Sequence, residues 1–243
     1  MNFSKMKDEA INGVKWYFNR NWNRDDVMNM DEISDELHST LEIVYLSLFC
    51  AMLSITCGST LQWISITAGK YSVLYFVAKL ILLYLTPPER VKMRIIISML
   101  AEYSFGSTVG FICSYLFKIE NRFVFRLLVG ITIGIGNLWH QAIKTKDRRE
   151  IYTGCLKYCI VIVVSMISFF LLETDTTLRM IAIHSVLILL MGYLVLYSQE
   201  ILYDANFGDI SFVNCTFTVF FHFPGIMIHA TRLYLQGEQQ EQN

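Results

Sequence analysis

Apolar segments recur along the chain after a polar start, and their lengths carry the main structural signal. Seven such segments cover residues 41–63, 68–85, 95–117, 124–139, 151–172, 180–202 and 212–235. An α-helix needs about 20 residues to cross the hydrocarbon core of a bilayer, within a range of about 17 to 25. No stretch alternates at period two for the length that a barrel strand needs. The pattern therefore predicts an all-α fold, a polytopic membrane helical bundle of about seven transmembrane helices.

The same pattern divides the chain into three regions. Residues 1–40 form a polar tail, residues 41–235 form the membrane domain, and residues 236–243 form a short polar tail. No apolar core follows the first basic residues, so we expect no cleavable signal peptide. The seventh segment contains His222, Pro224, His229 and Arg232. We expect it to be kinked or sheltered from lipid by the other helices, and it either crosses the membrane or dips in and returns.

Composition and charge support a membrane location and suggest an orientation. The 243 residues are 54% hydrophobic and 17% charged, which is too apolar for a soluble globular domain and too weakly charged for a disordered one. Basic side chains gather in the 86–94 and 140–150 loops. The positive-inside rule therefore predicts a cytosolic N-terminus, with both of these loops also in the cytosol.

A motif near the end of the sixth segment points to a family. The run MGYLVLYSQEILYDANFGD covers residues 191–209 and contains six motif positions: Gly192, Tyr193, Gln199, Glu200, Gly208 and Asp209. It resembles the GYxxxDTQEII…GD signature of the Bax inhibitor-1 family, the transmembrane Bax inhibitor motif proteins. Further matching runs are LEIVYLSLFCAML from Leu41, LTPPERVKMR from Leu85 and KDRREIY from Lys146. The resemblance is closest to plant-type members and covers roughly residues 33–235.

The resemblance implies a function without catalysis. It implies a multi-pass protein of the endoplasmic reticulum membrane that suppresses programmed cell death, as an apoptosis inhibitor in the stress response. It also implies a part in calcium homeostasis through a slow, pH-sensitive calcium leak. Two function classes follow: a regulator that acts through protein partners, and a calcium-permeable leak channel.

Two positions depart from the family at the expected gate. The resemblance implies a pair of buried aspartates that share a proton, one in the sixth span and one in the seventh, but this chain has Tyr197 and His222 there. A phenol and an imidazole cannot act as a two-carboxylate switch. The replacement is a polar pair that ties two helices together, or else a pore plug or a weak histidine pH sensor. The loss of both aspartates favours the regulator over the channel.

Glu102 and Lys79 are the other candidate ion-path positions. Glu102 lies in the third segment and Lys79 in the second, on either side of a tight turn and at nearly the same depth. They form a buried ion pair, or else Glu102 lines a pore while Lys79 extends to the membrane surface.

Small residues indicate packing. Gly106 and Gly110, like Gly130 and Gly134, are spaced for close helix approach, which we interpret as contact within the chain rather than dimerisation.

The remaining chemistry-bearing residues form no recognisable site. The 6 cysteines show no CxxC spacing, the 5 histidines form no HExxH set, and the serines lack a GxSxG context. We expect no enzyme, no catalytic residue, no metal and no cofactor. The expected partners are membrane lipid and other proteins, with possible calcium permeation and no nucleic acid. The ending QGEQQEQN lacks a basic amphipathic helix, which puts calmodulin contact in question.

Overall fold

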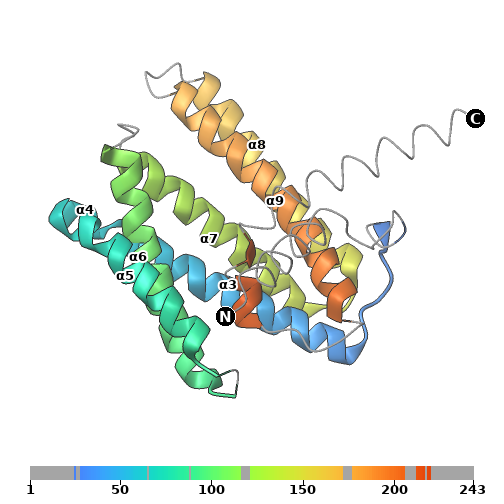
Figure 1. Cartoon of the computed structure of the whole chain (residues 1–243). Coiled ribbons are helices and arrows are strands. Elements are labelled where there is room, and N and C mark those ends of the chain that lie inside the picture. The colour runs from blue at the N-terminus through green and yellow to red at the C-terminus, as the bar shows by residue number, and fades with distance from the viewer. Residues whose placement is uncertain are drawn as a thin grey trace, which may run out of the picture.

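The computed structural model describes residues 25, 28–64, 66–87, 89–115, 121–171, 177–205, 212–216 and 218–219. The helices in order are α3 (Asp35–Ser59), α4 (Leu61–Ile64), α5 (Ile66–Leu85), α6 (Val91–Tyr115), α7 (Asn121–Lys144), α8 (Arg148–Leu171) and α9 (Thr177–Ala205) (Figure 1). Within the described ranges the extended pairing is one isolated bridge between Glu32 and Asp147. The predicted all-α fold class is confirmed.

The first six predicted segments each coincide with helix. Among the described residues, α3, α6, α7 and the 183–205 part of α9 are long and apolar enough to cross a membrane. The first segment is divided at Thr60, where the chain turns between α3 and α4. The seventh is described only at its start, as helical residues 212–216 and 218–219, which we call the returning segment. Whether it crosses lies outside the described residues.

The start of α3 also differs from the predicted region boundary at residue 40. Helix α3 begins at Asp35, and Ile33 and His38 are already buried. The backbone N–H of Ile33 donates to the Lys146 carbonyl at 3.1 Å, which fixes the chain before α3 against the α7–α8 connection. The last residues of the predicted polar tail are therefore part of the folded bundle.

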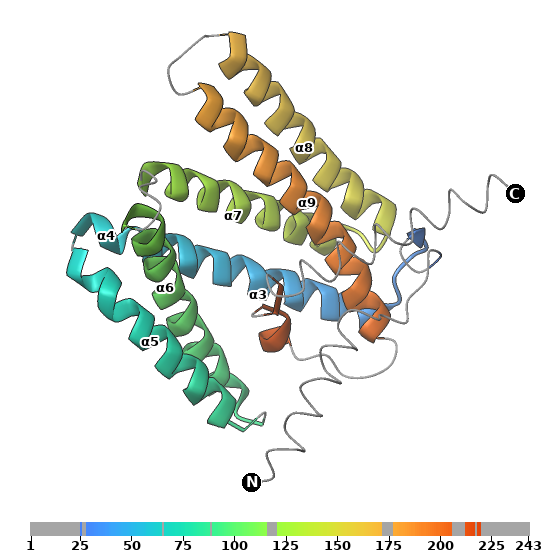
Figure 2. The same cartoon turned by 45° about the horizontal axis from the view of Figure 1, so that its top comes forward.

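Helix α3 lies at the centre of the bundle. It packs against α6, α7 and α9, while α5 pairs with α6 and α8 pairs with α9 (Figure 2). The most deeply buried core side chains come from different helices and include Leu41, Tyr45, Leu138, Ile151 and Met191. The outer helices α5 and α8 expose large apolar side chains, such as Leu74 and Val161. Apolar side chains on the outside of a membrane bundle suit contact with lipid tails.

Glycines allow the closest helix contact, which is between α3 and α6. A Cβ atom on Gly106 would collide with the backbone of Ile55, and one on Gly58 would collide with the backbone of Tyr103. Gly130 and Gly134 of α7 face Leu187 and Met191 of α9. The predicted contacts within the chain are confirmed at Gly106, Gly130 and Gly134.

Candidate functional site

The sixth-segment motif lies in the second half of α9, where most of its side chains are buried. Tyr193, Tyr197, Gln199 and Glu200 are at most 3% exposed, whereas Gly192 is exposed. Gly208, Asp209 and His222 lie outside the described residues. The motif therefore faces the interior of the bundle, where its side chains form hydrogen bonds with neighbouring segments.

Two tyrosines of the motif hold the returning segment. The Tyr197 hydroxyl donates to the Cys215 carbonyl at 2.8 Å, and the Tyr193 hydroxyl donates to the Val219 carbonyl. Tyr193 and Tyr197 are one helical turn apart, and their partners follow in the reverse order along the chain. The returning segment therefore runs antiparallel to α9, as a seventh helix would.

These contacts bear on the predicted pair of Tyr197 and His222. The Tyr197 hydroxyl also lies 3.4 Å from the Thr218 hydroxyl. Its single proton points to the Cys215 carbonyl, so this phenol serves as a helix-to-helix tie in the described part of the structure. The imidazole that was predicted to meet it lies outside that part.

Gln199 joins three separate parts of the chain. Its side-chain carbonyl accepts a hydrogen bond from Arg148 Nη1 at 3.0 Å, and its amide donates to the Asn29 carbonyl at 2.8 Å. Next to it, the Tyr45 hydroxyl of α3 donates to Ser198 at 2.5 Å. The sequence motif identified Gln199, but no signal at Asn29 or Tyr45 showed that these residues are its neighbours.

Glu102 lies in α6 with a 5% exposed side chain, and the Ser98 hydroxyl donates to its carboxylate at 2.8 Å. Lys79 of α5 is partly exposed, and no basic side chain of the described residues lies within ion-pair distance of Glu102. Of the two predicted alternatives, the buried ion pair with Lys79 is therefore wrong, whereas a pore-lining role for Glu102 stays a prediction. The physical reason is that the Ser98 hydroxyl, one turn earlier on the same helix, donates a hydrogen bond to the carboxylate. The Glu102 side chain faces α3 and the returning segment.

Glu102 lies at the border between two cavities. One, of about 210 Å³, lies among α3, α5, α6, α7, α9 and the returning segment. The other, of about 260 Å³, lies between α3, α6 and the returning segment. Ala51, Glu102 and Thr216 border both cavities. Glu102 is thus the ionisable side chain that borders both cavities.

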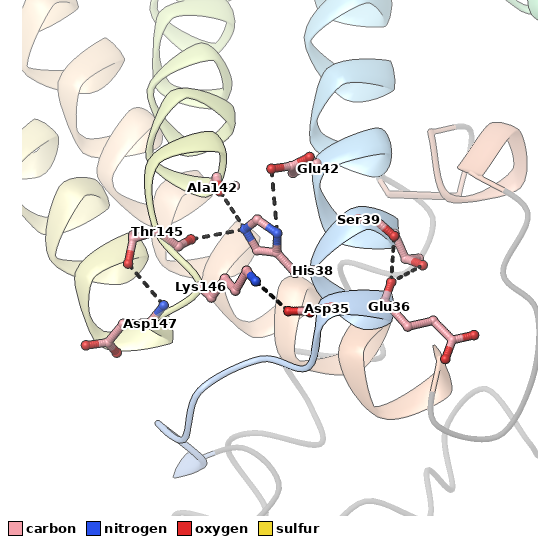
Figure 3. A network of polar contacts seen from close by, with 10 residues as sticks. Asp35, Glu36, His38, Ser39, Glu42, Ala142, Thr145, Lys146 and Asp147 are labelled. Atoms are coloured by element: carbon pink, nitrogen blue, oxygen red, sulfur yellow. Dashed lines mark hydrogen bonds and ion pairs between the residues drawn. The ribbon is translucent and has the colours of Figure 1, made fainter.

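Sequence reasoning missed a cluster of polar contacts around His38, at the start of α3. His38 Nε2 lies 2.7 Å from the Ala142 carbonyl and 3.1 Å from the Thr145 carbonyl, at the end of α7 (Figure 3). Its Nδ1 lies 3.6 Å from the Glu42 carboxylate. Carbonyls only accept hydrogen bonds, so Nε2 carries the proton and caps the end of α7. A histidine four residues before a glutamate is too common a spacing to have revealed this role.

Lys146 forms an ion pair with Asp35 at the surface, beside the His38 contacts. Its ammonium donates to the Asp35 carboxylate (Figure 3), and this hydrogen bond raises the pKa of Lys146 above its ordinary value. Because both side chains are exposed, at 52% for Lys146 and 88% for Asp35, water and salt screen the pair. Of these two contacts, His38 rather than the ion pair is therefore the stronger polar tie.

Replacing His38 by leucine is expected to lower the free energy of unfolding by about 1 to 2 kcal/mol, because buried carbonyls at the end of α7 lose their donor. His140 on α7 is exposed, so His140→Leu serves as the matched control and should change stability by less than about 0.5 kcal/mol. Unfolding in detergent micelles, followed by circular dichroism, measures both. Equal effects of the two substitutions would show that His38 caps nothing.

The described residues contain no group of three or more His, Cys, Asp or Glu side chains that could hold a metal ion. The described cysteines are free thiols.

Two curated relatives match nearly the whole chain. It is 24% identical over 218 residues to Bax inhibitor 1 of Oryza sativa subsp. japonica, which covers 89% of this chain and 88% of the relative. It is 21% identical over 225 residues to Bax inhibitor 1 of Arabidopsis thaliana, which covers 92% of this chain and 91% of the relative. No family model and no solved structure match the chain.

Proposed function

Because this chain is a divergent member of the Bax inhibitor-1 family, we propose that it is a non-catalytic membrane suppressor of programmed cell death, active during endoplasmic reticulum stress. The observation that carries the proposal is the match along about nine tenths of both chains, since a shared segment alone would support much less. The helical bundle with its buried sixth-span motif supports the same proposal. The protein acts through its fold and its protein partners, without a catalytic group.

The proposed location is the endoplasmic reticulum membrane, with the N-terminus in the cytosol. The basic loops support this orientation. The start of α3 and the α7–α8 connection, which are predicted to share one side of the membrane, lie together at one end of the bundle. Labelling of a cysteine introduced at exposed Arg149, by an impermeant thiol reagent in sealed microsomes, tests the orientation.

Survival of cells in which expression of Bax triggers death tests the main proposal. Cells that produce this chain are expected to survive better than cells with an empty vector, by a margin visible in colony counts. Tyr197→Phe, which keeps the buried ring but loses the hydrogen bond to Cys215, should retain most of the protection if the motif acts by packing. Survival no better than with the empty vector, at matched protein levels, would contradict the proposal.

A pH-sensitive calcium leak with replaced gate carboxylates is the second candidate function. Its supporting observation is Glu102 at the border of two cavities. The lining of the cavities argues against this candidate. Calcium takes six to eight oxygen ligands, and these cavities are lined mainly by apolar side chains.

Calcium efflux from liposomes that hold the purified protein tests the leak. We expect little efflux across about pH 6 to 8 from the unmodified protein, because neither Tyr197 nor His222 restores a shared-proton carboxylate pair. The double substitution Tyr197→Asp and His222→Asp is expected to produce an acid-sensitive leak. Efflux from the unmodified protein would instead promote the channel, with Glu102→Gln as the next variant to measure.

A further inference from the structure

The cavity beside Glu102 has the composition of a site for an apolar molecule. Apart from Glu102 and Thr216, every side chain that lines the 210 Å³ cavity is apolar. Phe76 and Phe105 contribute two aromatic rings from α5 and α6, tilted by 42° to each other at a centroid distance of 5.1 Å. Ligand sites typically combine such a lining with a few polar groups that fix orientation.

The polar group is a carboxylate that the fold has already removed from water. Glu102 is 5% exposed, and its hydrogen bond in the described structure comes from the neutral hydroxyl of Ser98. A buried charge is stabilised by a partner of opposite charge. Since the protein itself has already desolvated this carboxylate, a cationic ligand group would gain the attraction without that part of the cost. The site therefore favours a cation on the ligand.

The second cavity provides a route from the lipid. It meets the first at Ala51, Glu102 and Thr216. Its border includes four apolar side chains that are 37 to 47% exposed, namely Ile43, Leu46, Ile95 and Met99. Exposed apolar side chains on spanning helices face lipid, so a molecule dissolved in the bilayer reaches Glu102 between α3 and α6.

We propose that these joined cavities bind a compact apolar amine from the bilayer, with its ammonium group against Glu102 and its apolar body in the 210 Å³ cavity. A cavity of about 150 Å³ accepts benzene, so this one admits a cage of roughly ten carbon atoms. A calcium ion is a poor fit. It needs several oxygen ligands, whereas the walls of this cavity are mainly apolar.

Binding of two matched probes to the full-length protein in lipid nanodiscs tests the site. 1-Adamantylamine carries an ammonium group at neutral pH, and 1-adamantanol has the same cage without a charge. Empty nanodiscs give the partition into lipid, which is subtracted from both. The amine is expected to bind about tenfold more tightly than the alcohol, because its ammonium adds the attraction of an opposite charge to the hydrogen bond that either probe can donate to Glu102.

Three variants separate the carboxylate from the cavity. Glu102→Gln keeps the shape and can still accept from Ser98, so it should abolish the preference for the amine while alcohol binding stays within about twofold. Ile131→Phe adds volume on the α7 side of the cavity and should weaken both probes, with Glu102 intact. Gly192→Ala, on the exposed side of α9, is the control and should change neither. The melting temperature of each variant without probe shows that it is folded.

Several outcomes would overturn the proposal. Equal binding of amine and alcohol to the unmodified protein would show that Glu102 does not distinguish the charged probe from the neutral one. A preference that survives Glu102→Gln would place the amine elsewhere, and binding unaffected by Ile131→Phe would place the cage elsewhere. Displacement of the amine by calcium would assign Glu102 to a cation route instead. These outcomes are independent of the survival assay, which tests the proposed function.

Discussion

Replacement of Gly106 by alanine is expected to lower the free energy of unfolding by about 1 to 2 kcal/mol. Alanine is intrinsically better than glycine in a helix by about 1 kcal/mol, which alone would stabilise the protein. Against this gain, the added Cβ would collide with the backbone of Ile55 on α3. A backbone carbonyl cannot rotate away as a side chain can, so α3 and α6 must separate, and overpacking of this kind costs about 1 to 3 kcal/mol or more.

The control for Gly106→Ala is another helical glycine. Gly192 in α9 has no heavy atom within 4 Å of a built Cβ, so Gly192→Ala should leave stability unchanged or raise it by up to about 1 kcal/mol. Denaturant unfolding in bicelles, with both variants beside the unmodified protein, gives the two changes with opposite signs. A loss of equal size at both positions would mean that the α3–α6 contact is looser than described.

The glycines also show how much of the fold the sequence could predict. The spacing of Gly106 and Gly110 indicated close packing, but it could not show that the partner helix is α3. Gly58 gave no signal of its own, although it faces the backbone of Tyr103 in the same contact. Helix positions follow from local runs of apolar residues, whereas the choice of neighbour depends on shapes that meet only in three dimensions.

The sequence likewise predicted part of the candidate site but not all of it. The motif predicted that Tyr197, Gln199 and Glu200 belong to an important part of the sixth segment, and all three are buried in α9. The depth of Glu102 was predicted, but its partner was not, because Lys79 and Ser98 are both within reach along the sequence. Helix rotation decides between them, and the amphipathic signal that would fix rotation is weak in a helix that is apolar on most sides.

Replacement of Arg148 by methionine is expected to lower the free energy of unfolding by about 2 to 3 kcal/mol. Arg148 is 8% exposed, and its guanidinium donates to the side-chain carbonyl of Gln199 at 3.0 Å. Without that donor, a buried amide oxygen loses a charge-assisted hydrogen bond and stays out of water. The amide nitrogen of Gln199 holds Asn29, so the loss should also loosen the chain before α3.

The neighbouring arginine supplies the matched control. Arg149 is exposed, so Arg149→Met removes the same charge from the same connection and should cost less than about 0.5 kcal/mol. The double change Arg148→Met with Gln199→Met should cost less than the sum of the single changes, because the two side chains lose one shared bond. Additive losses would mean that Arg148 and Gln199 stabilise the bundle separately. Coupled losses would show that the glutamine of the sixth-span motif stabilises the bundle by joining α8, α9 and the N-terminal approach to α3, a role that needs neither of the missing aspartates.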